Sequence, residues 1–344
     1  MAVEGALAEG EASIVRDIRG RPLNALRISV TDRCNFRCQY CMPRKVFGPD
    51  FEFMARNLLL TFEEIDLVVT SLMPLGLSKV RLTGGEPLMR KQLGNLISAL
   101  AKHDLDLALT TNGALLAKQA QTLADAGLKR ITISLDALDK KTFHIMNDVK
   151  VDPQVVLNGI SASEKAGLPI KINAVIRRGI NEHSILELAR YFHGTPHILR
   201  FIEFMDVGQT NGWNIEEVVT AAEILEILST EFEVESIDPI EKGEVAKRYR
   251  YKDGGGEIGI VTSVSMPFCG DCNRARLTAD GRLFTCLFSA DGFDTRRLIR
   301  GDSSEEEIGS AISNIWRQRD DRYSEIRTED TSLRSKVEMS IIGG

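Results

Sequence analysis

Short β-type segments alternate with longer amphipathic helical segments over the first two-thirds of this 344-residue chain, and this order restricts the fold most. Strands that are separated by helices pair in parallel through right-handed crossovers. The expected strands are residues 26–32, 80–87, 107–113, 131–137, 170–179 and 199–206. Six strand–helix units are too few for a closed eight-stranded barrel. The sequence therefore predicts an α/β fold with a partial, open (β/α)6 barrel.

Two of the expected helices begin with capping signals. Thr61 with Glu64, and Thr220 with Glu223, have the spacing of a capping box, in which each side chain accepts a hydrogen bond from a backbone amide of the first turn. Polar motifs follow the expected strands, namely Asp32 onward, TGGEP, TTNG, SLDA and EFMD. In open parallel sheets the chemistry collects at the carboxyl ends of the strands, so we expect the functional site at that edge.

The pattern changes after about residue 236, where β-type alternation surrounds a glycine-rich hairpin turn at residues 254–256. A helical segment follows near EEEIGSAISNIWRQR. We therefore expect an N-terminal extension over residues 1–20, the barrel over 21–235, a smaller C-terminal α+β domain over 236–338, and a Gly-Gly tail over 339–344.

All six cysteines of the chain fall into two triplets, Cys34, Cys38 and Cys41, and Cys269, Cys272 and Cys286. Thiolate ligands favour zinc, copper(I) or iron–sulfur clusters. A structural zinc site needs four ligands, whereas each triplet supplies three and the five histidines lie far away in sequence. Two cubane clusters with three cysteines each would keep one open iron apiece, and this interpretation is favoured. Disulfides, buried thiols and an imperfect zinc knuckle are the alternatives.

Composition and charge exclude several classes of protein. The formal net charge of −6 argues against a broad nucleic-acid-binding surface but allows a local basic pocket. The N-terminus has neither a secretory signal nor a transit-peptide pattern, and no apolar run is long enough to span a membrane. We therefore expect a cytoplasmic protein without nucleic-acid or membrane partners, in which clustered thiols indicate metal or redox chemistry.

Several motifs in a fixed order resemble one known family. They are RISVTDRCNFRCQYCMP, RLTGGEPLMR, TTNG, ITISLDALD, FHIMNDVK, RFIEFMDVG, FCGDCNRARLTADGRLFTCLF and the terminal GG. The CxxxCxxC spacing with Tyr40 before the last cysteine resembles radical S-adenosylmethionine enzymes. Over nearly its whole length the chain is similar to the GTP 3′,8-cyclases, the radical enzymes of molybdenum cofactor biosynthesis; the first dozen residues lie outside the resemblance.

The resemblance implies a role for each matching residue. Cys34, Cys38 and Cys41 would hold one [4Fe-4S] cluster, whose open iron binds S-adenosylmethionine, and Cys269, Cys272 and Cys286 would hold a second, whose open iron binds guanine. The implied contacts to S-adenosylmethionine are Tyr40, Gly85, Ser134 and Met205. The implied contacts to GTP are Arg27, Arg81, Thr110, Lys171, Arg274 and Arg276. Arg276 and the tail glycines Gly343 and Gly344 are the implied catalytic residues, with the tail reaching into the pocket.

The implied reaction is that of a lyase. A reduced first cluster cleaves S-adenosylmethionine, and the resulting 5′-deoxyadenosyl radical removes hydrogen from C3′ of GTP. Attack of C3′ on C8 of guanine then leads to 3′,8-cyclo-7,8-dihydro-GTP. The implied partners are an external one-electron reductant, a downstream cyclic pyranopterin monophosphate synthase that consumes the product, and a second copy of the chain in a homodimer.

Plainer interpretations exist for several of these residues. On these interpretations, Arg81 would be a solvated or salt-bridged arginine at a strand end, Met205 would pack in the core, and Thr110 would hydrogen-bond only within its own loop. Glu86 is expected to support the GGEP backbone. No histidine has an evident acid–base partner, so all five are expected to be structural. The rival functions are a peptide-modifying radical enzyme with an auxiliary cluster and a zinc-stabilised interaction or nucleic-acid-binding protein.

Overall fold

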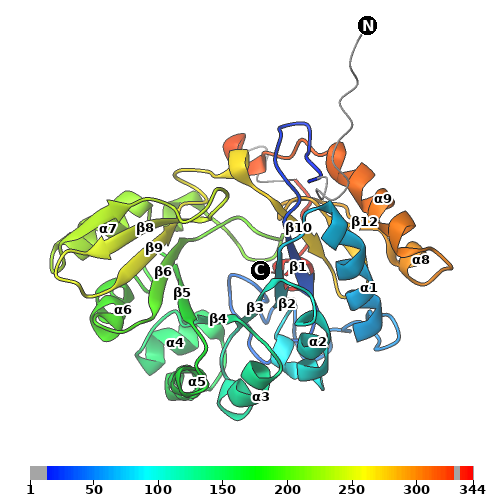
Figure 1. The fold of residues 1–344 in the computed structure, drawn as a ribbon. Coiled ribbons are helices and arrows are strands. Elements are labelled where there is room, and N and C mark those ends of the chain that lie inside the picture. The colour runs from blue at the N-terminus through cyan, green and yellow to red at the C-terminus, as the bar shows by residue number, and fades with distance from the viewer. Residues whose placement is uncertain (1–13, 329–333, 344) are drawn as a thin grey trace, which may run out of the picture.

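The computed structural model describes residues 14–328 and 334–343 and contains one strongly curved twelve-stranded sheet (Figure 1). The first nine strands are β1 (Ala25–Ser29), β2 (Lys79–Thr83), β3 (Asp106–Thr111), β4 (Arg130–Ser134), β5 (Ile170–Ile176), β6 (Ile198–Glu203), β7 (Val234–Ile237), β8 (Ala246–Tyr251) and β9 (Glu257–Val261). The last three are β10 (Arg274–Leu277), β11 (Arg282–Phe284) and β12 (Phe293–Asp294).

The strand order is β12-β11-β10-β1-β2-β3-β4-β5-β6-β9-β8-β7. Strands β1 to β6 pair in parallel, which confirms the six-unit partial barrel. The C-terminal strands extend this sheet at both ends: β10 pairs in parallel with β1, and β9 in parallel with β6. The glycines at 254–256 join the antiparallel strands β8 and β9, as predicted. The C-terminal half therefore continues the sheet of the barrel.

Helices cover the convex face of the sheet, and the C-terminal segment lies within its curve (Figure 1). The α-helices are α1 (Phe62–Leu72), α2 (Leu93–Leu100), α3 (Ala120–Asp125), α4 (Lys140–Asn147), α5 (Pro153–Lys165), α6 (Ser184–Phe192), α7 (Ala221–Ser229), α8 (Arg296–Ile299), α9 (Glu305–Arg317) and α11 (Met339–Ile342). The 3-10 turns are η1 (Met73–Leu75), η2 (Pro87–Met89), η3 (Leu116–Lys118), η4 (Ile215–Glu217), η5 (Cys269–Asp271) and η6 (Tyr323–Glu325).

The predicted capping boxes are present at the starts of α1 and α7. Thr61 accepts a hydrogen bond from the backbone N–H of Glu64, while the Glu64 side chain accepts one from the backbone N–H of Thr61. Thr220 and Glu223 form the same reciprocal pair. These bonds satisfy amides that have no partner within the helix and so fix where each helix begins.

Each predicted strand ends earlier than expected. The observed last residues are Ser29, Thr83, Thr111, Ser134, Ile176 and Glu203. The motif residues after them turn away from the sheet; Gly84, for example, has a φ of 149°, which a residue with a side chain rarely adopts. The polar motifs thus form loops above the carboxyl edge of the sheet, which frees their backbone groups for other contacts.

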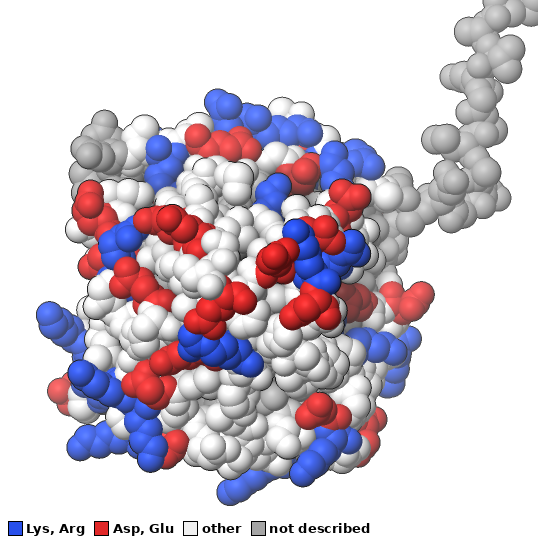
Figure 2. Space-filling view, turned by 90° about the vertical axis from the view of Figure 1, so that its left-hand side faces the viewer, with Lys and Arg blue, Asp and Glu red and all other residues white. Residues whose placement is uncertain are grey.

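The face of the molecule opposite α9, over α6 and α7, carries acidic and basic side chains intermingled (Figure 2). Such a face has no large area of one sign, in line with the modest net charge of −6. Within residues 14–328 and 334–343, no helix combines the length and apolar character needed to cross a membrane.

Candidate active site

Both cysteine triplets line one cavity of about 290 Å³ inside the curve of the sheet. A cavity of this size is at the lower end of the range of small-molecule sites. Its walls also include most of the residues that the sequence singled out, namely Arg27, Tyr40, Arg81, Gly85, Thr110, Ser134, Met205, Arg274 and Arg276. Segments far apart in the sequence therefore meet at a single site.

The two triplets lie at opposite ends of the parallel strands, the first at the carboxyl ends and the second at the amino ends. Cys34 follows β1 and lies at its carboxyl edge. Cys269 and Cys272 precede β10, which runs parallel to β1, so they lie at the amino edge. Cys286 follows the antiparallel strand β11 and reaches the same amino edge. The motifs at the carboxyl ends of the strands line the cavity, as expected. The second triplet adds ligands from the amino ends, because β10 pairs in parallel with β1 and the triplet precedes it.

All six cysteines are free thiols, which excludes the disulfide alternative in this structure. Sulfur ligands of one Zn²⁺ ion, each about 2.3 Å from the metal, lie within about 4 Å of one another. Among the described residues, neither triplet gathers its three sulfurs within 4.8 Å. The described lining of the cavity contains no histidine that would complete a zinc site. Three thiolates at this wider spacing fit a multi-iron cluster with one open corner.

Burial opposes ionisation in both triplets, and in the second it raises the pKa of Cys286 to about 12. Burial raises the pKa of Cys34 to about 12, and it also raises the pKa values of Cys38 and Cys41. Burial opposes ionisation of Cys272 as well, but the charges of Arg274 and Arg319 outweigh it and lower its pKa to about 6. Buried thiolates need a positive partner, which iron supplies at the first triplet and which arginines supply in part at the second.

The first triplet is surrounded by the residues of the predicted S-adenosylmethionine contacts. The Tyr40 hydroxyl donates to Asp136 Oδ2 at 2.8 Å, and burial raises the pKa of Asp136 to about 6. A Cβ on Gly85 would lie 2.4 Å from the Arg33 carbonyl oxygen. Gly85 is therefore required by the close packing of two loops, in addition to any close approach by a ligand.

Glu86 has the supporting role that was expected for it. It is buried and accepts hydrogen bonds from the Thr111 hydroxyl at 2.7 Å and from the backbone N–H groups of Asn112 at 2.7 Å and Leu88 at 3.0 Å. Burial raises its pKa to about 7 in spite of these three donors. Glu86 thus ties the loop after β2 to the loop after β3 and keeps both in place above the cavity.

Three arginines form a row between the two triplets. Arg27 on β1 is in register with Arg276 on β10 and with Arg81 on β2. Side chains in register on adjacent parallel strands point to the same face, which here is the cavity. Burial and mutual repulsion lower the pKa of Arg27, and burial above all lowers the pKa values of Arg81 to about 9 and of Arg276 to about 10. The row is therefore a cationic surface whose electrostatic repulsion a bound anion would reduce.

The contacts of the row bear on whether Arg81 is a solvated side chain and whether Thr110 bonds only its own loop. Arg81 Nη1 donates to the hydroxyls of Thr110 and Thr132, both at 2.9 Å. Arg81 thus points into the cavity, and Thr110 contacts an arginine from another strand. Arg274, which is not part of the row, lies beside the second triplet, with its Nη2 3.3 Å from Cys272 Sγ.

Arg200 is a site residue that the sequence reasoning missed. It is buried on β6, lines the cavity and donates to Asn173 Oδ1 at 2.9 Å, and burial lowers its pKa to about 10. An arginine inside an otherwise apolar strand was the signal available. Lys171 does not line the cavity, although burial and the charge of Arg200 lower its pKa to about 8. Lys171 therefore lies at the margin of the cationic surface.

The C-terminal tail reaches the same cavity. The Gly343 carbonyl accepts a hydrogen bond from Arg276 Nη1. A Cβ on Gly343 would lie 2.6 Å from Thr83 Cγ2, so a larger residue would not fit against β2. Met339, at the start of α11, lines the cavity. Gly344 lies outside the described residues.

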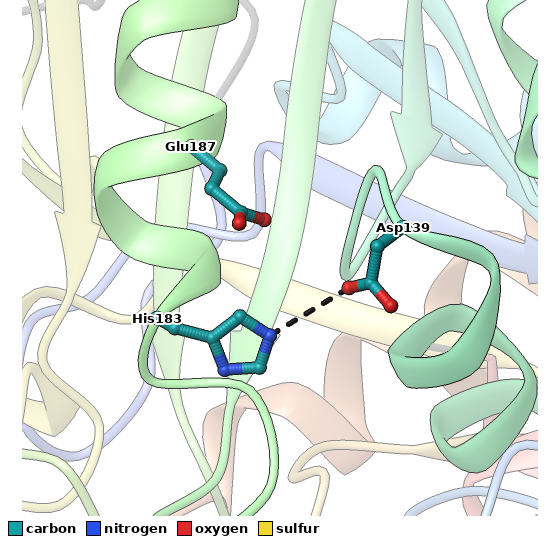
Figure 3. Close-up of side chains that lie close together, drawn as sticks. All are labelled: Asp139, His183 and Glu187. Carbon is teal, nitrogen blue, oxygen red and sulfur yellow. Dashed lines mark ion pairs between the residues drawn. The ribbon is translucent and has the colours of Figure 1, made fainter.

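The expectation that no histidine has an acid–base partner is wrong. His103 lies 2.9 Å from Asp66, and His193 lies 3.0 Å from Asp253. His183, just before α6, points toward Asp139 across 3.6 Å (Figure 3).

Glu187 lies one turn along α6 from His183, and its ligand atoms and those of Asp139 and His183 all lie within 4.8 Å of one another (Figure 3). The His183 side chain is 52% exposed. None of these three residues lines the cavity. The group is therefore an exposed cluster on the outer surface, separate from the active site.

Comparison with known proteins agrees with the fold. Residues 28–192 match the family model "Radical SAM superfamily" and residues 197–325 match "Molybdenum Cofactor Synthesis C". The crystal structure of Streptococcus suis SuiB bound to S-adenosylmethionine superposes with a TM-score of 0.61 at 15% identity, covering 90% of this chain and 68% of SuiB. The chain is therefore a radical SAM protein with a molybdenum cofactor synthesis C-terminal region.

Relatives over the full length narrow the class. A GTP 3′,8-cyclase of Acidothermus cellulolyticus is 48% identical, with 96% of this chain and 99% of the relative covered. A GTP 3′,8-cyclase of Staphylococcus carnosus is 46% identical with the same coverage. This chain belongs to the GTP 3′,8-cyclase family.

Proposed function

We propose that this enzyme converts GTP into (8S)-3′,8-cyclo-7,8-dihydroguanosine 5′-triphosphate, the first step of molybdenum cofactor biosynthesis. The observation that carries the proposal is the row of Arg27, Arg81 and Arg276 inside a cavity with one cysteine triplet at each edge. Guanidinium groups bind phosphate oxygens in forked pairs. The cavity thus offers a triphosphate its counter-charge between two sites for soft metal clusters.

The six thiols are the ligands available for the clusters. Cys34, Cys38 and Cys41 would hold the first [4Fe-4S] cluster, and Cys269, Cys272 and Cys286 the second. When bound, the first cluster supplies the electron that splits S-adenosylmethionine, and the resulting 5′-deoxyadenosyl radical begins the reaction at C3′ of GTP. The chain's own residues supply position and exclusion of water, which matter because a radical that misses its target damages the site.

The repulsion among the cavity's cations explains why the site favours a polyanion. Four arginines of the cavity have lowered pKa values in the free protein: Arg200 and Arg276, which are buried, and Arg27 and Arg81, which are half-buried. A triphosphate removes this repulsion and satisfies the donors, so part of the cost of burying these charges is offset only on binding. Thr110, Lys171 and Arg274 complete the proposed GTP contacts, while Tyr40, Gly85, Ser134 and Met205 are the proposed contacts to S-adenosylmethionine.

The tail completes the proposed site. Gly343 lies against Arg276 and Thr83, two residues that line the cavity. We assign Gly343, Gly344 and Arg276 to the conversion of that radical. Deletion of both glycines should leave cleavage of S-adenosylmethionine intact and abolish cyclisation.

Further parts of the proposal concern the surroundings of the enzyme. The reaction needs an external one-electron reductant, and a downstream cyclic pyranopterin monophosphate synthase consumes the product. A homodimer and a cytoplasmic location stay predictions. The division into residues 1–20, 21–235, 236–338 and 339–344 also stays a prediction, and β7 runs across its middle boundary.

Anaerobic incubation with GTP, S-adenosylmethionine and a reductant, followed by mass analysis, tests the function. We expect 5′-deoxyadenosine and the cyclised nucleotide in equal amounts. Cys38→Ala should abolish formation of deoxyadenosine, since it removes a ligand of the first cluster. Cys272→Ala should mainly weaken GTP binding. Deoxyadenosine formed by the Cys38→Ala protein would contradict the assignment of the first triplet.

A further inference from the structure

The segment that leads to the C-terminal tail is held by the loop between β6 and α7. We propose that Asp206, in this loop, is a positioning residue that anchors the C-terminal segment through Lys336 and thereby sets how far Gly343 reaches into the cavity. This inference rests on the proposed role of the tail. It concerns residues 204–210 and 336–338, where the only function expected from the sequence is the contact of Met205 with S-adenosylmethionine.

Asp206 is a buried carboxylate that receives three side chains from the C-terminal part of the chain. Lys336 Nζ donates to its Oδ2 at 2.8 Å and also to its backbone carbonyl at 2.8 Å. Arg327 Nε donates to Oδ1 at 3.0 Å, and the Tyr323 hydroxyl donates to Oδ2 at 2.5 Å. Burial opposes ionisation of Asp206, but these donors outweigh it and lower its pKa. A buried carboxylate with this many donors fixes the geometry of every partner.

A second contact lies two residues further along the chain. Glu338 Oε1 accepts from the backbone N–H of Gln209 at 3.1 Å, and Oε2 accepts from the Thr210 hydroxyl at 3.0 Å. Gly208 has a φ of 67°, and a Cβ there would lie 2.4 Å from Glu338 Oε2. The loop thus meets the segment at Lys336 and again at Glu338, with a glycine where the two chains come closest.

The tail is short, so its position depends on this anchor together with the packing of its own buried side chains, Ser340 and Ile342. The helix α11 is four residues long, and isolated helices of that length are not stable in water. It begins directly after Glu338 and ends directly before Gly343. A single turn rises about 1.5 Å per residue, so fixing Glu338 fixes the position of Gly343 closely. The anchor is therefore the element that places the Gly343 carbonyl beside Arg276.

The anchor also contacts the loop of the second cysteine triplet. Phe288, two residues after Cys286, stacks on Tyr323 with ring centroids 4.4 Å apart, and Lys336 Nζ lies 4.9 Å from the Tyr323 ring centroid. Phe288 lines the cavity. The same group of side chains therefore joins the tail, the end of β6 and the second triplet, which suits a device that positions the tail relative to the substrate.

The test compares Lys336→Met and Lys336→Arg with a matched control, Lys252→Met. Lys336 is chosen rather than Asp206 because Asp206 is next in sequence to Met205, a proposed contact to S-adenosylmethionine. Lys252 is the control because it pairs with Glu233 at the surface, where the Lys252 side chain is 52% exposed. In the Lys336→Met enzyme we expect at least a tenfold fall in cyclised product per 5′-deoxyadenosine formed, with cleavage of S-adenosylmethionine retained. Lys336→Arg should recover most of this ratio, and Lys252→Met should leave it unchanged.

Hydrogen exchange supplies a readout apart from activity. The amides of residues 339–343 should exchange at least tenfold faster in Lys336→Met, while those of β1 to β6 stay protected. Asp206→Asn should give the same pattern. If the Asp206→Asn protein does not fold, the comparison of Lys336→Met with Lys336→Arg decides. An unchanged product ratio and unchanged exchange in Lys336→Met would overturn the anchor.

Deletion of Gly343 and Gly344 separates the two ideas. If the deletion abolishes cyclisation while Lys336→Met does not alter it, the anchor is wrong and the tail role stands. If the deletion leaves cyclisation intact, the proposed tail role itself fails, whatever Lys336→Met does.

Discussion

The arginines of the cavity show what single residues contribute. Arg27, Arg81 and Arg276 each occupy one strand, and the strand register alone brings them into a row. Their like charges raise the free energy of the empty site, while the same charges favour a bound triphosphate. A residue that weakens the free protein and strengthens the complex is typical of a binding site.

Lys171 gives the site a dependence on pH. Burial and neighbouring cations lower the pKa of Lys171 to about 8 in the free protein, and a bound triphosphate would raise it. The ammonium form therefore contributes to GTP affinity fully below pH 8, and the contribution is lost as the pH rises through 8 and above. Equilibrium dialysis between pH 7 and 9.5 should show affinity falling several-fold.

Lys171→Arg supplies the control, because an arginine stays charged over this range. Its GTP affinity should be nearly flat between pH 7 and 9.5. An equal fall of affinity in both proteins would show that Lys171 is not the titrating group.

At the scale of elements, the loops after the strands depend on close backbone contacts. A Cβ on Gly85 would lie 2.4 Å from one carbonyl oxygen and 2.9 Å from another, those of Arg33 and Asp32. Backbone atoms on both sides cannot move without shifting the loop that carries Cys34. The loops after β1 and β2 therefore act as one unit.

Gly85→Ala tests this unit. We expect a loss of about 2 kcal/mol or more in the free energy of unfolding, because the added methyl overlaps backbone atoms. Gly94→Ala is the matched control, since Gly94 lies in α2 and a Cβ there would lie 3.6 Å from Thr122 Cγ2, an ordinary van der Waals contact. That change should be neutral or stabilise by up to about 1 kcal/mol. Denaturant unfolding of both proteins gives the comparison, and equal stabilities would refute the account.

At the scale of the whole molecule, residues 17–21 meet Arg319, which follows α9, beside the backbone of the second triplet. Asp17 is buried and accepts hydrogen bonds from Arg21 Nε at 2.6 Å and Arg319 Nη1 at 3.1 Å. Arg21 also donates to the Cys269 carbonyl at 2.8 Å, and Arg319 to the Cys272 carbonyl at 2.7 Å. One carboxylate near the N-terminus thus holds two arginines against the backbone of two proposed cluster ligands.

Asp17→Ala should release the second cluster and spare the first. The change removes the carboxylate partner of the buried Arg21 and leaves Arg319 with Asp321 alone. Breaking a buried ion pair typically costs about 3–5 kcal/mol. We expect iron in anaerobic preparations to fall from about eight to about four atoms per chain. Asp320→Ala, at an exposed pair with Arg19, should retain the full content. Iron and acid-labile sulfide analysis makes the measurement, and full iron in Asp17→Ala would contradict this role.

Local patterns in the sequence were sufficient for the barrel and for grouping the cysteines into two triplets, which the structure brings to one cavity. The six parallel strands, the two capping boxes and the hairpin at residues 254–256 follow from periodicity and turn chemistry, which act between residues close in the chain. The strand ends were placed too late, because the residue at which a strand stops pairing is decided by its neighbours in the sheet, which a local pattern does not reveal. Resemblance to a family, by contrast, was needed to assign any residue to GTP.

The sequence by itself determined which groups this protein carries: six thiols in two triplets, a set of basic side chains on strands, and alternating elements that make a parallel sheet. Only the tertiary structure decided that β10 pairs with β1, because strand pairing between residues 250 positions apart leaves no local pattern. That pairing puts the second triplet at the opposite edge from the first, places Arg276 beside Arg27 and makes one cavity. Arg200 and the Asp206 anchor became visible for the same reason, since burial and long-range contacts exist only in the folded chain.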